Sequence, residues 1–192
     1  MTKGRLEAFT DGVVAIIITI MVLELKVPQA TDLAALQASV PIFLAYALSY
    51  VNVGIFWNNH HHMLHATDRV DGRVLWANLF LLFWLSLIPF VIRWMDEAGI
   101  TALPTAAYGF VLAMAAVGYT LLQASIVAAN GGGNSKLATA VGSDFKGKAS
   151  LALYFVSVPL AFVNSWISVA IYILVALIWF VPDSRIETSV RK

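Results

Sequence analysis

Long runs without a charged residue are the feature that most constrains this chain. Asp, Glu, Lys and Arg are absent from residues 40–57 and 74–92, which are 18 and 19 residues long. A transmembrane helix needs about 20 consecutive apolar residues. Further uncharged runs cover residues 12–23, 98–130 and 149–182. Because the runs are continuously apolar rather than alternating, they favour helices over barrel strands and predict an all-α integral membrane protein.

Two of the runs need interpretation before spans are counted. The first reaches spanning length only if its helix begins near Leu6 and carries Glu7 and Asp11 into the membrane edge. The fourth suits a helix that begins near Pro104 and ends at the three glycines 131–133, because proline suits a first turn and glycine ends a helix.

The last run, residues 149–182, is too long for one helix and just long enough for two short ones. Pro159 and the pair Asn164 and Ser165 are the natural places to turn. The sequence therefore predicts six transmembrane helices in a single domain that covers residues 1–192 and leaves no room for a soluble domain.

Basic residues distribute unevenly between the two sides of such an arrangement. With the N-terminus in the cytoplasm, ten of the twelve Lys and Arg residues fall inside, and only Lys26 and Arg93 fall outside. Cytoplasmic loops carry an excess of Lys and Arg, so the pattern predicts cytoplasmic N- and C-termini and an even number of spans. The ten residues are Lys3, Arg5, Arg69, Arg73, Lys136, Lys146, Lys148, Arg185, Arg191 and Lys192.

A cleaved signal peptide is the alternative interpretation of residues 1–25. Lys3 and Arg5 precede an apolar stretch, as in such peptides, but Glu7 and Asp11 interrupt the transition. No small-x-small cleavage site follows, so we expect the first helix to be retained.

Composition excludes several other classes of protein. Hydrophobic residues make up 60% and charged residues 12%, so a soluble domain of this size could not bury its apolar surface. The net charge is +1 and no basic cluster is present, which excludes a nucleic-acid partner. The absence of cysteine removes disulfides, thiolate metal sites and cysteine nucleophiles. Since no phosphate-binding Gly-rich loop and no G-x-S-x-G motif occurs, we expect neither an enzyme nor a cofactor.

The first helix opens on an unusual polar stretch. An acid at the mouth of an apolar helix is costly unless it is paired, although an acid in a first turn also complements the helix dipole. Arg5, Phe9, Thr10 and Asp11 resemble the Arg-x-x-x-Phe-Ser-Asp signature of the prokaryotic form of the endosomal/lysosomal potassium channel family (transmembrane protein 175-like), with Thr in place of Ser.

Further motifs of that family follow in order. Residues 57–60 (WNNH) resemble its W-x-x-H, residues 75–79 (LWANL) its L-x-x-N-L, and residues 88–90 (IPF) its L-P-F. The resemblance covers roughly residues 5–95 with specific motifs. Beyond residue 95 it extends only to the number and length of the helices.

The resemblance implies a homotetramer, because each chain supplies one quarter of a pore that the first helices line. It also implies a constriction of apolar side chains in place of backbone carbonyls, and no TVGYG filter sequence occurs here. By the family's pattern, Ile16 is the principal constriction and Ile20 and Leu23 form layers above it. Thr19 would offer a ring of hydroxyls at or beside the narrowest point.

Helical geometry alone leaves the pore face of the first helix open. At about 100° per residue, Val14, Ile18, Met21 and Leu25 fall opposite a second stripe, and both stripes are apolar. Thr19 is the single polar side chain inside the span and favours its own stripe as the pore face, whereas ordinary lipid or packing contact is the alternative. That stripe comprises Gly12, Ile16, Thr19, Ile20, Leu23 and Val27.

A second group of residues is expected to hold the first helix in place without touching the ion. Hydrogen bonds and a salt bridge on the cytoplasmic side would pin it to the second and third helices. Removing one partner from a buried pair costs several kcal/mol, so such a network sets helix position. The group comprises Arg5, Phe9, Thr10, Asp11, His60, Trp76 and Asn78.

A histidine cluster supports one alternative, a membrane metal-binding protein. His61 and His65 are four residues apart and His62 and His65 three apart, which is metal-ligand spacing on a helix. Asp68 and Asp71 follow in a loop, but the H-E-x-x-H arrangement is absent. Imidazoles at a membrane interface also anchor to headgroups or sense pH.

The mid-helix prolines Pro89 and Pro159 support a second alternative, an ion-coupled secondary transporter with broken helices. Against it, no ionisable residue lies inside any span beyond Asp11, and no internal repeat is visible. These absences favour passive conduction, and the family resemblance implies a potassium-permeable channel in the plasma membrane of a prokaryote. Its partners would be the lipid bilayer, potassium ions and identical subunits.

Overall fold

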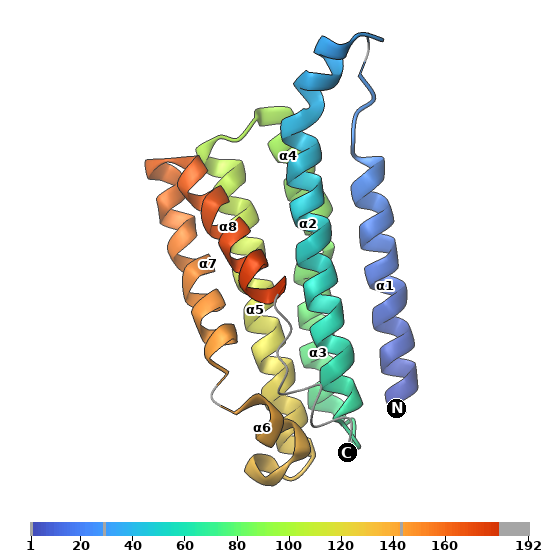
Figure 1. Cartoon of the computed structure of the whole chain (residues 1–192). Helices are drawn as coiled ribbons and strands as arrows, with labels where there is room; N and C mark the ends of the chain where they lie inside the picture. The colour runs from blue at the N-terminus through green and yellow to red at the C-terminus, as the bar shows by residue number, and fades with distance from the viewer. Residues whose placement is uncertain (1, 29, 143, 181–192) are drawn as a thin grey trace.

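The computed structural model describes residues 2–28, 30–142 and 144–180 as a helical bundle (Figure 1). The predicted cytoplasmic C-terminus, with Arg185, Arg191 and Lys192, lies outside the described residues. The helices are α1 (Lys3–Leu23), α2 (Leu33–His65), α3 (Gly72–Ser86), α4 (Ile88–Ala98), α5 (Ala102–Ala129), the 3₁₀ turn η1 (Gly132–Asn134), α6 (Lys136–Val141), α7 (Phe145–Val163) and α8 (Ser165–Phe180).

Local sequence explains where several of these helices begin. Asp32 accepts a hydrogen bond from Ala35 N at the start of α2, and Asp71 accepts from Val74 N at the start of α3. Such side-chain caps satisfy backbone N–H groups that have no partner within the helix. Asn164 has extended backbone and separates α7 from α8, so the predicted turn at Asn164 and Ser165 is confirmed.

The predicted third span is present, but it is interrupted between α3 and α4. Leu87 separates the two helices, and Pro89 lies in the first turn of α4. Proline has no N–H and cannot donate a helical hydrogen bond to the carbonyl of Leu85. The Leu87 N–H instead bonds to Trp84 O at 3.2 Å, which tightens the chain before the helix resumes.

Five segments of the described chain are long and apolar enough to cross a membrane. They are α1, α2, the combined α3–α4 segment (Gly72–Ala98), α5 and α7. The sixth predicted helix corresponds to α8, an apolar helix whose described length is 16 residues. The all-α membrane architecture is therefore confirmed, whereas six full spans stay a prediction.

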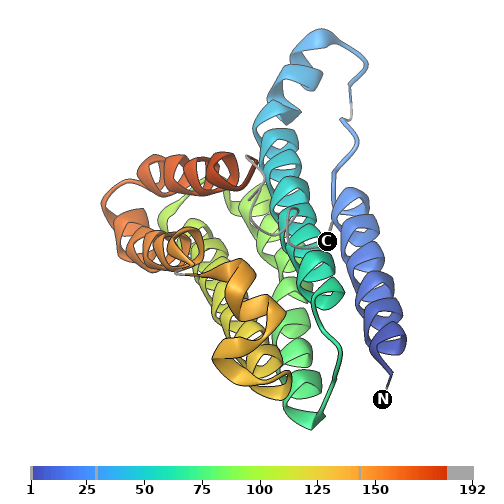
Figure 2. The ribbon, with the colours of Figure 1, turned by 60° about the horizontal axis from the view of Figure 1, so that its bottom comes forward.

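α5 lies at the centre of the bundle, between α3 and α7 (Figures 1 and 2). α8 packs on α7, and α1 lies at one edge, where it contacts α2, α3 and α4. Leu112, Ala113 and Ala115 of α5 are fully buried. Because only one side of α1 is covered by its own chain, the other side is free for contact outside the subunit.

A glycine allows α3 and α5 to approach closely. A Cβ added at Gly118 of α5 would lie 2.8 Å from the Cα of Leu81 on α3 and 3.1 Å from its backbone nitrogen. Backbone atoms cannot move aside as a flexible side chain does, so only glycine fits this contact.

Gly118→Ala is expected to lower the free energy of unfolding by about 1–3 kcal/mol, because α3 and α5 must separate to admit the methyl group. The melting temperature in detergent, followed by tryptophan fluorescence, measures the effect. Gly54→Ala is the matched control, since nothing lies within 4 Å of a Cβ at that helical position. Equal melting temperatures for the two variants would contradict the close-packing argument.

The two ends of the bundle differ in charge. The start of α1, the α2–α3 loop and α6 lie at one end, which we name the basic end (Figure 1). Asn130 at the end of α5 joins that helix to the α2–α3 loop there, because its side-chain oxygen accepts from Asp68 N at 3.0 Å and Arg69 N at 2.8 Å. The end of α1, which Lys26 follows, and α4, which carries Arg93, lie at the opposite end, which we name the far end (Figure 1).

Candidate functional site

α1 has one covered face and one open face. Leu6, Thr10, Val14, Ile17 and Met21 are buried against the rest of the chain at helical spacing. The open face carries apolar side chains, with Ile16 59% exposed. Its members Phe9, Gly12, Ile16, Thr19, Ile20 and Leu23 fall on one stripe of the helix. The stripe that carries Thr19 is thus the one left open, a choice that hydrophobicity alone does not make.

Thr19 is the one hydroxyl on this open face. Its Oγ1 lies 2.9 Å from Ile16 O and 3.0 Å from Ala15 O, so its proton is donated to the helix backbone. Threonine commonly makes this contact in helices. The hydroxyl therefore presents an oxygen lone pair outward, as an acceptor and not as a donor.

A buried polar network joins α1 to α2 and α3. Asn78 of α3 donates from Nδ2 to the Thr10 hydroxyl at 3.0 Å, and its Oδ1 accepts from His60 Nε2 at 2.8 Å. All three residues are buried. Because Oδ1 only accepts, the His60 proton lies on Nε2. This network fixes the rotation of α1, since turning the helix would leave the Thr10 hydroxyl and the Asn78 Nδ2 amide without their shared hydrogen bond.

Three further contacts connect α1 to α2 near the basic end. Trp57 Nε1 donates to Asp11 Oδ1 at 2.7 Å, and His61 Nδ1 lies 3.2 Å from Glu7 Oε1. Lys3 Nζ donates to the backbone oxygen of His65 at 3.3 Å. α1 and α2 are therefore in polar contact from the N-terminus of α1 to Asp11.

The site residues predicted from sequence divide into two groups in the single chain. Thr10, His60 and Asn78 meet in the buried network, whereas Asp11 bonds to Trp57. Phe9, Arg5 and Trp76 lie at the surface, with Trp76 74% exposed. Within the described part of the chain, the side chains of Arg5 and Trp76 make no hydrogen bond or ion pair. Their roles in the network stay a prediction.

The histidine cluster is compact but is not assembled around a metal site. The ring of His61 lies 4.9 Å from that of His65 and 5.8 Å from that of His62, measured between ring centres. Among the described residues, no group of three or more His, Cys, Asp or Glu side chains is placed to hold a metal ion. His61 instead pairs with Glu7.

Sequence reasoning missed some of the contacts that position α1. Trp57 was noted only as part of a motif, yet its indole is the partner of Asp11. Trp57 lies three residues before His60, so the two side chains share one side of α2. This spacing could have predicted that Trp57 also faces α1. The far-end pair of Glu24 and Arg93 was also missed, although Lys26 and Arg93 are the only Lys and Arg residues of that end in the part of the chain that the structure describes.

An open groove of about 870 Å³ runs beside α1, between it and the α3–α4 segment. Ile16 and Ile20 line it from α1, and Phe90 and Trp94 line it from α4. Glu24, Arg93 and Glu97 lie at its far end. α1 is therefore loosely packed on this side, unlike on the side that carries Val14 and Met21.

The fold and site together define an all-α integral membrane protein. In it, a buried polar network holds one face of α1 and leaves the opposite, apolar face open. The sequence model for the endosomal/lysosomal potassium channel TMEM175 matches residues 5–89. A potassium channel of Chryseobacterium sp. (strain P1-3) is 50% identical over 192 residues, which is the full length of both chains. A potassium channel of Streptomyces collinus is 34% identical over 128 residues, covering 62% of each chain.

A solved structure agrees with these matches. The crystal structure of a lysosomal potassium-selective channel TMEM175 homologue from Chamaesiphon minutus has a TM-score of 0.80 and 26% sequence identity, over 94% of this chain and 97% of that one. The chain belongs to the TMEM175 family. The resemblance inferred from residues 5–95 is thereby confirmed.

Proposed function

We propose that this chain is the subunit of a potassium-permeable channel whose pore is lined by α1 and closed by apolar side chains. The observation that carries this proposal is the open face of α1: the opposite face is held by buried packing and by the Thr10–Asn78–His60 network. A helix anchored in this way presents a fixed row of side chains to whatever lies beside it. The names of the relatives supply potassium as the permeant ion.

The proposed assembly is a homotetramer around the open faces of four α1 helices. One chain offers a single such face, and a closed pore requires several copies arranged about an axis. Ile16, Ile20 and Leu23 would then form successive rings, with the Thr19 hydroxyl oxygens between them. Mass measurement of the protein in detergent or nanodiscs tests this assembly, and a stable monomer would remove the shared pore.

Conduction follows from the chemistry of such rings. A narrow ring of isoleucines loses its water and blocks ions until it widens. The groove between α1 and α4 offers space for Ile16 and Ile20 to move aside as the ring opens. Potassium releases its hydration shell more easily than sodium, so a ring without strong oxygen ligands would favour potassium, but only modestly.

The proposed orientation places the basic end in the cytoplasm of a prokaryotic cell, with the protein in the plasma membrane. Lys3, Arg69, Arg73 and Lys136 belong to segments of that end, whereas Lys26 and Arg93 lie at the far end. This asymmetry follows the positive-inside rule. The His60 network and the Asp11–Trp57 contact would then lie toward the cytoplasmic side of the pore.

Reconstitution into planar bilayers with unequal potassium and sodium on the two sides tests the proposed activity. Unitary currents that reverse toward the potassium equilibrium potential are the expected result. Saturable flux that needs a second ion gradient and shows no unitary events would instead support a transporter. Activity that requires zinc and is lost when His61, His62 and His65 are replaced would support the metal-binding alternative.

A further inference from the structure

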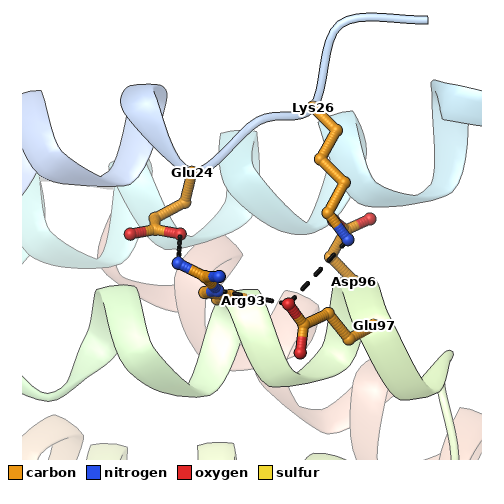
Figure 3. Close-up of polar contacts among 5 residues, drawn as sticks. All are labelled: Glu24, Lys26, Arg93, Asp96 and Glu97. Atoms are coloured by element: carbon orange, nitrogen blue, oxygen red, sulfur yellow. Dashed lines mark hydrogen bonds and ion pairs between the residues drawn. The ribbon is translucent and has the colours of Figure 1, made fainter. Parts of the chain in front are cut away.

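A cluster of five charged residues joins the far end of α1 to α4 (Figure 3). Arg93 of α4 donates from Nη1 to Glu24 Oε2 at 3.1 Å and from Nε to Glu97 Oε1 at 3.2 Å. Lys26 Nζ lies 3.2 Å from Asp96 Oδ2 and 3.9 Å from Glu97 Oε1. Glu24 and Lys26 directly follow α1, which ends at Leu23.

The cluster bridges the one side of α1 that is loosely packed. The groove between α1 and α4 is lined along its length by apolar side chains such as Ile16 and Ile20, and Glu24 and Arg93 face each other at its far end. Buried packing fixes α1 elsewhere, and at the far end of this groove ion pairs add to the contact between the two helices. The 3.1 Å pair of Glu24 and Arg93 directly connects the end of α1 to α4.

We propose that Arg93 is a positioning residue for ion selectivity, acting through Glu24 to fix the far half of α1. This inference rests on the proposed channel function, in which Ile20 and Leu23 of that half line the pore. A ring of apolar side chains discriminates between ions by its width. Freeing the helix end lets the ring sample wider positions, so the ability to distinguish potassium from sodium falls.

The chemistry of Arg93 suits this role. Its planar guanidinium engages two carboxylates at once, one on each side of the groove's end, through two different nitrogens. Lysine carries a point charge and cannot bind two carboxylates in this way. The Arg93→Lys variant should therefore retain only part of the selectivity for potassium over sodium. The side chains of both Arg93 and Glu24 are partly exposed, so the pair is of modest strength and sensitive to salt.

The test is the potassium-to-sodium permeability ratio, from reversal potentials of the full-length protein in planar bilayers. Glu24→Gln and Arg93→Gln are each expected to lower the ratio about threefold, the size that loss of one exposed ion pair allows. The charge-swapped double variant, Glu24→Arg with Arg93→Glu, should recover the unmodified ratio. Recovery of this kind separates an interaction between the two residues from a general structural effect.

Glu97→Gln is the matched control. It removes an equal charge beside Arg93 and keeps the bond between Arg93 and Glu24, although it also removes the longer 3.9 Å pair with Lys26. Its ratio should stay close to that of the unmodified protein. Ratios unchanged in Glu24→Gln and Arg93→Gln would overturn the proposal, as would an equal fall in the control or failure of the swapped variant to recover.

A measurement on the unmodified protein guards against variants that do not assemble. Raising ionic strength with an impermeant organic salt screens exposed pairs, so the ratio should fall in the unmodified channel and stay constant in Arg93→Gln. A ratio independent of salt in the unmodified channel would count against the proposal. Absence of any potassium current from the unmodified protein would instead refute the proposed function itself.

Discussion

Asn78→Leu is expected to lower the free energy of unfolding by about 3–5 kcal/mol, and the channel would then fail to assemble at ordinary temperatures. Leucine matches asparagine in size but offers no hydrogen bond. Thr10 and His60 would both remain buried and lose their partner, which lies at 3.0 Å and 2.8 Å, respectively. Each unpaired buried group costs about 1–3 kcal/mol. Thermal melts in detergent and the yield of assembled protein measure the loss.

Two comparison variants make this expectation specific. Asn58→Leu makes the same substitution at an exposed position of α2 and should leave stability almost unchanged. Adding Thr10→Val to Asn78→Leu removes one of the two unpaired buried groups. The double variant should recover part of the lost free energy of unfolding, because replacing both partners of a bond is less costly than replacing one. A melting temperature for Asn78→Leu equal to that of Asn58→Leu would show that the network does not hold α1.

Ile16→Asn is expected to raise cation current severalfold and to reduce the discrimination between potassium and sodium. In the proposed pore, an amide at this position keeps water in the ring and removes the dewetting barrier. The side chain is 59% exposed in the single chain, so the substitution leaves the buried face of α1 intact. Single-channel recordings give the conductance, and reversal potentials give the permeability ratio.

Val22→Asn is the matched control for this second prediction. Val22 lies on the same helix and is 46% exposed, but it points about 120° away from Ile16 around the helix axis. Equal changes in current from both variants would indicate a general disturbance of α1. A change confined to Val22→Asn would place the pore on another face and refute the proposed constriction.

The helical architecture was predictable because a membrane imposes simple requirements. Spanning length, uncharged runs and a turn at Asn164 were sufficient to locate the helices and to separate α7 from α8. The interruption before Pro89 was less visible, because proline is compatible both with a kink within one helix and with a restart of the helix. Only the backbone geometry at Leu87 distinguishes these outcomes.

The candidate site was predictable from sequence only in part. Thr10, His60 and Asn78 were identified through their motifs, and the structure brings them into one network. The open face of α1 was not decidable from hydrophobicity, because both faces are apolar in a membrane protein. The bond between Glu24 and Arg93 joins residues 69 positions apart, and no local pattern encodes a contact that depends on how α1 and α4 pack.

The length of α2 carries a consequence of another kind. With 33 residues it is about 50 Å long, whereas the hydrocarbon layer of a membrane is about 30 Å thick. Hiding all of it would require a tilt of about 50°, beyond the range of about 0–40° found for membrane helices. Part of α2, among its first and last turns, therefore extends beyond the hydrocarbon layer. Trp57 of α2 donates a hydrogen bond to Asp11 of α1. A change in bilayer thickness that alters the tilt of α2 is therefore expected to shift α1 as well.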